Sequence, residues 1–119
     1  MSRVKRSVHA KKKRRATLER TKGYRGQAKS SYKLAKEALL KADSYSYAHR
    51  RQRKRDFRRL WIVRINAAAR QEGLTYGQFM HGLREAGIEL DRKVLADIAV
   101  RDPETFRRFT EQAREAAAA

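Results

Sequence analysis

Hydrophobic positions are unevenly distributed along this chain, and their spacing predicts helices almost throughout. From Gln27 to Glu72 there is no glycine or proline, and residue types that favour helices predominate. We therefore predict one long helix over residues 27–72. Residues 43–47 (DSYSY) are its weakest part, where it bends or breaks, because Asp and Ser compete for backbone hydrogen bonds. Before residue 57 the apolar positions are too sparse to form a core against a partner helix.

From Phe57 onward, apolar residues recur at steps of three and four and predict a small helical bundle. Turn and capping residues mark the ends of three further helices: Gly73, Thr75 with Gln78, Gly87, Asp91, and Asp102 with Pro103. The predicted core residues are Phe57, Trp61, Ile65, Phe79, Leu83, Leu95, Ile98 and Phe106. The predicted fold class is all-α, with a long basic helical extension (residues 1–56) followed by a globular helical domain (residues 57–119).

The positive charge lies entirely in the first half of the chain. Residues 1–60 contain 22 Lys and Arg against 4 Asp and Glu, whereas residues 61–119 contain 9 of each. Such a basic segment repels itself, so we expect residues 1–56 to be partly disordered in the free protein, with a helical turn or two within residues 10–20. Phosphates reverse this balance, because binding them releases condensed counterions. The KKKRR run at residues 11–15, taken alone, also fits a solvated tail or a localisation signal.

The distribution of charge around the long helix favours folded RNA over other polyanions. Basic residues of the 50–59 segment cover every face, whereas a membrane-surface helix needs a separate apolar face. A basic helix for duplex DNA usually has a heptad dimerisation seam beside it, and none follows here. Folded RNA encloses a helix from several sides and offers unstacked bases to tyrosines. Tyr24, Tyr32, Tyr45 and Tyr47 are candidates for such stacking, and local packing is the alternative for each.

Glycines in the KGYRG segment (residues 22–26) predict a hinge between helices or a close approach to a sugar–phosphate backbone. The segment lacks the preceding strand and the GKS ending of a nucleotide-binding loop. Together with the basic runs, it completes the predicted RNA-binding set. That set is Arg3, Lys5, Arg6, Lys11, Lys12, Lys13, Arg14, Arg15, Lys22, Tyr24, Arg25, Lys29, Tyr32, Lys33, Tyr47, His49, Arg50, Arg51, Arg53, Lys54, Arg55, Arg58 and Arg59.

Catalytic and metal chemistry finds little support in the sequence. There is no cysteine, which excludes disulfides and thiolate metal sites and suits a reducing compartment. His9, His49 and His81 are far apart and form no ligand-spaced cluster. We therefore expect no enzyme activity, no metal and no cofactor. No apolar stretch approaches the length of a membrane span, and the N-terminus lacks the apolar segment of a secretory signal, so we expect a cytoplasmic protein.

Three segments resemble a known family: RRQRKRDFRRLWIVRINAAAR (residues 50–70), LTYGQF (74–79) and GIELDRKVLADIAV (87–100). With the KGYRG segment, they closely resemble the bacterial large-subunit ribosomal protein family L-twenty, nearly end to end. The resemblance implies an extension threaded into large-subunit 23S rRNA, a helical domain on the outer side of the subunit, and an early role in subunit assembly. In some members it also implies repression of their own messenger.

The partners that this resemblance implies are large-subunit rRNA and neighbouring ribosomal proteins, with no membrane, no small-molecule substrate and no homo-oligomer. Two other classes fit the charge pattern. An architectural DNA-binding protein would prefer duplex DNA to structured RNA at matched salt. A membrane-active or adaptor helix would bind anionic vesicles as tightly as RNA.

Overall fold

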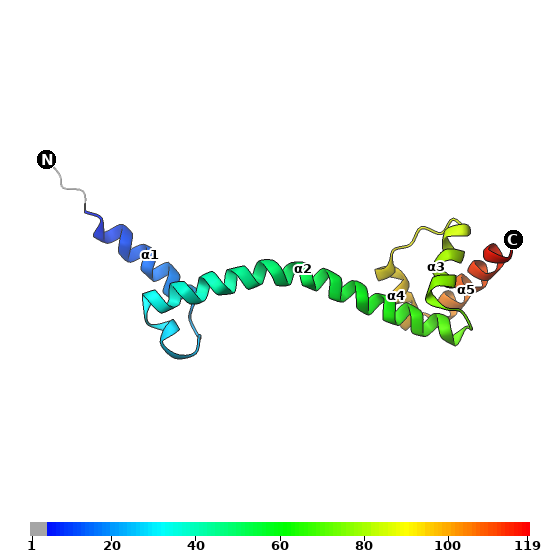
Figure 1. Cartoon of the computed structure of the whole chain (residues 1–119), viewed down its shortest axis with the longest axis horizontal. Helices are drawn as coiled ribbons and strands as arrows, with labels where there is room; N and C mark the ends of the chain where they lie inside the picture. The colour runs from blue at the N-terminus through cyan, green and yellow to red at the C-terminus, as the bar shows by residue number, and fades with distance from the viewer. Residues whose placement is uncertain (1–4) are drawn as a thin grey trace. The chain divides into compact units, whose positions relative to one another are not determined.

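The structure, a computed structural model, describes residues 5–119 and confirms the all-α class (Figure 1). Its helices are α1 (Ser7–Arg20), the short 3-10 helix η1 (Gly26–Lys29), α2 (Tyr32–Gln71), α3 (Tyr76–Glu85), α4 (Arg92–Arg101) and α5 (Pro103–Ala118), and no strand occurs between residues 5 and 119. The chain divides into two compact units, Met1–Arg51 and Gln52–Ala119. Each unit is described by itself.

In the first unit, the long helix begins later than the sequence predicted. It starts at Tyr32 rather than Gln27, because Gln27 belongs to η1 and the chain then turns at Ser30 and Ser31. Serine hydrogen-bonds its own local backbone and disfavours helix continuation; the Ser30 hydroxyl donates to the Gln27 carbonyl. The helix does not break at residues 43–47, since α2 runs through them without interruption.

The α1 helix is also longer than the one or two turns expected from the sequence. Three side chains of the first unit are buried: Thr21, directly after α1, and Ala35, near the start of α2, are at 0% exposure, and Leu39 is at 7%. The sequence analysis expected the apolar positions before residue 57 to be too sparse for a core against a partner helix, and it did not foresee these buried side chains. A strict search for a wide apolar stripe overlooks a core made of small residues, because Ala and Thr let two helices approach closely.

Between α1 and η1 the backbone follows the predicted hinge. Gly23 and Gly26 have φ angles of 86° and 71°, a left-handed conformation that costs little without a Cβ atom. This turn reverses the chain, so that α1 and the first turns of α2 share two contacts. The Arg14 guanidinium lies 5.8 Å from the centre of the Tyr32 ring, and Arg20 pairs with Asp43 at 2.7 Å.

The second unit consists of the last part of α2 with α3, α4 and α5, and its caps are those predicted. Thr75 and Gln78 form a reciprocal capping box at α3. Asp91 accepts from the Val94 N–H at the start of α4, and Asp102 accepts from the Thr105 N–H at the start of α5. These side chains satisfy backbone donors that a helix N-terminus leaves free.

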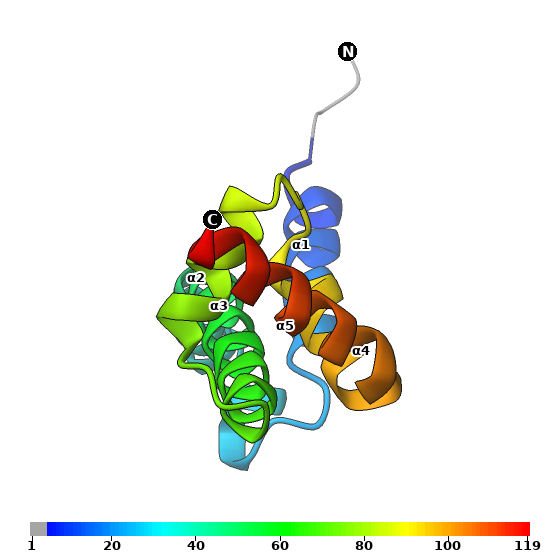
Figure 2. The ribbon, with the colours of Figure 1, turned by 90° about the vertical axis from the view of Figure 1, so that its right-hand side faces the viewer.

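The core of this unit is built around α5, which packs against α3 and, less extensively, α4 (Figure 2). Ile65, Phe79 and Leu95 are fully buried, and Leu83 and Phe106 are 2% exposed. The rings of Phe79 and Phe106 lie 4.9 Å apart between centroids. A glycine at position 82 permits close helix contact, since a Cβ there would run into the Ala113 backbone of α5.

Three of the predicted core residues lie nearer the surface. Trp61 and Ile98 are half-buried and pack against the core cluster. Phe57 was predicted wrongly: it is 42% exposed and lies outside that cluster. It lies one helical turn before Trp61, and the centroids of the two rings are 6.2 Å apart. Phe57 therefore continues the apolar spacing of the core residues, but it lies on the part of α2 that comes before the bundle.

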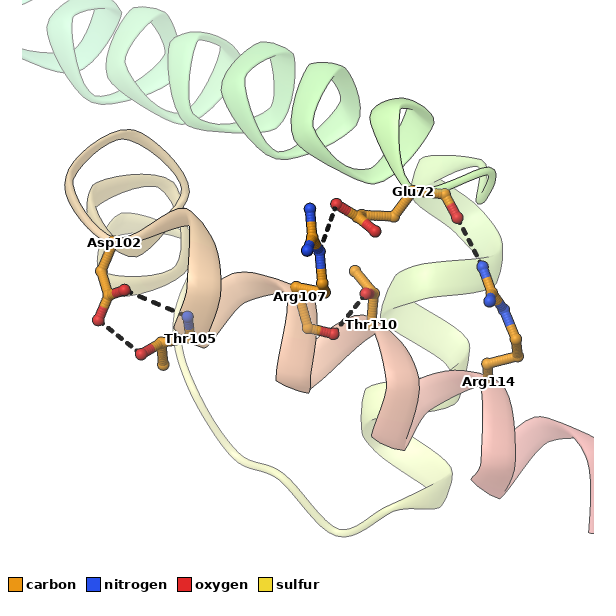
Figure 3. A network of polar contacts seen from close by, with 6 residues as sticks. All are labelled: Glu72, Asp102, Thr105, Arg107, Thr110 and Arg114. Atoms are coloured by element: carbon orange, nitrogen blue, oxygen red, sulfur yellow. Dashed lines mark hydrogen bonds and ion pairs between the residues drawn. The ribbon is translucent and has the colours of Figure 1, made fainter.

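Polar contacts fix the end of α2 to α5 (Figure 3). Arg107 Nε donates to the Glu72 carboxylate at 3.3 Å, and Arg114 donates to the Glu72 backbone carbonyl. Because the last carbonyls of a helix lack intrahelical partners, this second bond satisfies an acceptor that would otherwise need water. The two arginines therefore hold the C-terminal end of α2 in place in this unit.

Candidate nucleic-acid interface

Basic side chains crowd the α1 helix, and its N-terminal end lacks the usual stabilising contacts. Its N-cap residue Arg6 makes no side-chain cap bond, and its first turn contains no acidic residue. Lys11 and Arg15 are like charges one turn apart, which destabilises a free helix. The residues from Lys11 to Arg15 are all exposed. The local sequence thus leaves the positive charge at the start of this helix without a counterion.

The connection from α1 to α2 carries three more predicted contacts. Lys22, Arg25 and Lys29 are exposed, and Lys22 pairs with Glu19 at 3.5 Å. Tyr24 is half-buried, as is Tyr32 at the start of α2. These two tyrosines thus have one part of the ring packed and another part open to a ligand.

Further along α2, aromatic rings in the first unit are covered by neighbours one turn away. The Tyr45 and His49 rings stack at 5.6 Å with an interplanar angle of 7°, and the Lys41 ammonium lies 5.7 Å from the centre of the Tyr45 ring. The Arg51 guanidinium lies 3.5 Å from the centre of the Tyr47 ring and donates to the Tyr47 carbonyl. Tyr45 and Tyr47 are 51% and 56% exposed, so each remains partly accessible to a ligand.

At the start of the second unit, five exposed basic residues lie on several sides of α2. They are Arg53, Lys54, Arg55, Arg58 and Arg59. At 100° per residue they leave a sector of about 120° without a basic side chain, where Asp56 and Leu60 lie. Arg53 lies 5.5 Å from the Phe57 ring centre, within the range of a cation–π contact. Charges on several sides of a helix can be neutralised only by a ligand that wraps around much of it or by several ligands.

Ion pairing within the chain leaves most of this charge free. Four ion pairs occur within residues 5–119: Arg20–Asp43, Lys22–Glu19, Arg101–Asp97 and Arg107–Glu72. Lys22 alone belongs to the predicted RNA-binding set. The remaining described cations of that set are thus available to an external polyanion. Arg3, also in that set, lies outside the described residues.

Some basic residues near these positions were missed by the sequence reasoning. Arg20 and Lys41 were omitted, although an i,i+4 step places Lys41 beside Tyr45, a signal visible in the sequence.

In the second unit, a hollow of about 610 Å³ is lined by Trp61, Arg64, Asp91, Lys93, Val94, Ala96, Asp97 and Arg101. Its charges come from segments distant in sequence, so only the fold brings them together.

These helices are strongly basic and exposed, and most of their charge is not neutralised within the chain. Such helices are typical of proteins that bind nucleic acid. Nothing in residues 5–119 indicates a cluster of three side chains able to hold a metal ion. None of the helices in this range is long and apolar enough to cross a membrane.

Comparison with known proteins identifies the family. The model of ribosomal protein L20 matches residues 3–109, and the chain belongs to this family. A large ribosomal subunit protein bL20 from Roseiflexus sp. (strain RS-1) is 60% identical over 116 residues, covering 98% of this chain and 99% of the relative. Its counterpart from Acidithiobacillus ferrooxidans (strain ATCC 53993 / BNL-5-31) is 62% identical over 111 residues, covering 93% of each. The chain is therefore a structural ribosomal protein and not an enzyme.

Proposed function

We propose that this chain is a constituent of the large ribosomal subunit in the cytoplasm, where it binds 23S rRNA directly and supports early assembly of the subunit. The relatives are named as large-subunit proteins, and the alignment spans nearly the full chain. The observation that carries direct RNA binding is the exposed, unneutralised charge of α1 and α2.

Phosphate contacts supply the main attraction in this proposal. Each Lys or Arg that meets a phosphate releases condensed counterions, which makes binding favourable and dependent on salt. RNA can surround the basic part of α2, since its folded strands approach a helix from several sides. The exposed parts of the Tyr45–His49 and Tyr47–Arg51 pairs then offer contacts to unpaired bases.

The role in assembly follows from the same basic surface. Like charges on α1 repel one another until RNA neutralises them, so binding orders protein and RNA together, as an early assembly protein requires. Neighbouring large-subunit proteins complete the set of partners. Repression of the chain's own messenger rests on the family resemblance alone.

The dependence of affinity on salt tests direct RNA binding. We expect log K for 23S rRNA to fall steeply with log salt, and replacing Arg50 and Arg55 with Gln to reduce the slope by up to about two units, one per lost phosphate contact. The matched control replaces Arg84 and Arg108, which are exposed on α3 and α5. An affinity insensitive to salt would refute the proposal, and tighter binding to duplex DNA would favour an architectural DNA-binding protein.

A further inference from the structure

An exposed apolar strip lies on α2 in the second unit, away from the core. Phe57, Leu60 and Val63 are 42%, 39% and 58% exposed, and Ala67 is also exposed. Steps of three and four residues place these four side chains on one face of the helix. The core-facing Ile65 and Ala69, both fully buried, point away from Leu60, Val63 and Ala67, whereas Phe57 lies at the edge of the strip nearest the core. We call Phe57, Leu60, Val63 and Ala67 the α2 strip.

Local structure gives no reason for apolar residues at these positions. Valine has a low helix propensity, and an exposed valine does not offset this by burying apolar surface. Single exposed apolar residues are ordinary, but three large ones in succession on one helix face mark an interaction surface. The strip therefore indicates a partner that covers it.

Arginines flank the strip on both sides. Arg59 and Arg64 are exposed and lie one residue away from Leu60 and Val63. Neither Arg59 nor Arg64 takes part in an ion pair among the residues that the structure describes. Asp56 is the one carboxylate at the start of this face. A complementary partner thus presents apolar side chains with carboxylates around them.

The aliphatic centre of the strip argues against RNA as its occupant. Leu60 and Val63 have no ring on which a base can stack and no donor for a phosphate. Covering them with a sugar–phosphate backbone would desolvate charged oxygens against hydrocarbon without compensation. A second copy of the chain is also disfavoured, because its own Arg59 and Arg64 would meet the same charges.

We propose that the α2 strip docks a second protein whose contacting surface is apolar and rimmed by Asp or Glu. The contact places a protein neighbour on one face of α2, where Arg59 meets its carboxylates instead of RNA, while the other basic side chains of the predicted RNA-binding set meet RNA. It rests on the proposed function, because it places that neighbour in the large subunit. The proposal gives the partner's surface chemistry and its docking position.

The test places a photo-crosslinking benzoylphenylalanine at position 63 in the full-length chain and irradiates purified large subunits. We expect an adduct that resists ribonuclease and is removed by protease. Arg64→Glu, introduced into the same chain, should lower the adduct yield several-fold, since it reverses the charge offered to the carboxylates. The control carries the crosslinker at position 55, in the basic segment, where the adduct should be RNA.

Three outcomes would overturn the docking surface. These are an RNA adduct at position 63, an adduct of twice the chain's mass, or no adduct although the chain is present in the subunit. An unchanged adduct yield with Arg64→Glu would contradict the prediction that carboxylates surround the partner's apolar surface. If the wild-type chain were absent from purified large subunits by sedimentation, the proposed function itself would fail, and the docking surface with it.

Discussion

Arg20 on α1 donates to both carboxylate oxygens of Asp43 on α2, at 2.7 and 3.4 Å. The hydrogen bond and the charge of Asp43 raise the pKa of Arg20 above its ordinary value. This pairing joins α1 to α2 across the turn at Gly23 and Gly26. It also consumes one of the few carboxylates of the basic half, so the protein uses that charge to hold α1 on α2.

Replacing Asp43 with Asn should loosen α1. The ion pair is exposed, so its loss should alter local order without unfolding the second unit. Amide exchange on the free protein should become faster within residues 7–20 and stay unchanged within residues 76–118. Equal exchange in the wild type and in Asp43→Asn would show that the pair does not order α1.

Amide exchange on the free wild-type protein also tests the predicted partial disorder of residues 1–56. Protected amides throughout residues 10–50 would contradict that prediction.

Gly82→Ala should destabilise the second unit, by about 1–3 kcal/mol. The new Cβ would meet the Ala113 backbone of α5, and backbone cannot move aside as a flexible side chain can. Gly77→Ala is the matched control in the same helix, because a Cβ there meets nothing within 4 Å. The control should be neutral or stabilising by up to about 1 kcal/mol. Urea unfolding followed by helical circular dichroism measures both, and equal stabilities would contradict close α3–α5 packing.

Substitutions of Phe106 and Phe57 compare a buried apolar position with an exposed one. Phe106→Ala should cost about 3–5 kcal/mol, because the side chain is 2% exposed and its ring stacks on Phe79. Phe57→Ala should cost well under that, about 1 kcal/mol or less, since the ring is 42% exposed. Unfolding free energies of the two variants give the comparison. Similar losses would mean that Phe57 belongs to the core after all.

Asp102 should make the stability of the second unit depend on acid pH. The Thr105 hydroxyl and backbone N–H donate to its carboxylate and lower the pKa of Asp102 below its ordinary value of 3.8. A lowered folded-state pKa contributes stability above the unfolded value, and that stability is lost as pH falls through the folded value. Thr105→Val should therefore be less stable than wild type at neutral pH, and the difference should vanish on acidification. Thr105→Ser keeps the hydroxyl and should behave as wild type; a difference independent of pH would contradict this origin.

Much of the second unit was predictable because its signals are local. Capping residues such as Thr75, Asp91 and Asp102 act within one helical turn, so their sequence pattern fixes the helix starts. Spacing alone did not distinguish Phe57 from Ile65, because both continue the same apolar period. Only the position of α3, α4 and α5 decides which of these side chains is covered.

In the first unit, the missed features depend on distant contacts. The burial of Ala35 and the pairing of Arg20 with Asp43 join residues from two helices. Small residues such as Ala35 give only a weak hydrophobic signal. Asp43 disfavours a helix interior by its propensity, so the sequence predicted a bend or break there and not an ion pair. Charge, by contrast, is additive along the sequence, so the strongly basic surface was predictable without the fold.

Direct recognition of large-subunit rRNA is the central claim, and its selectivity tests it most directly. The measurement is the dissociation constant of the intact chain for 23S rRNA, for an unrelated structured RNA of equal length and for duplex DNA, at one salt concentration. Phosphate contacts alone would bind the two RNAs alike, whereas a recognised site adds affinity. We predict that the chain binds 23S rRNA at least about tenfold more tightly than either competitor. Equal affinity for all three would contradict it.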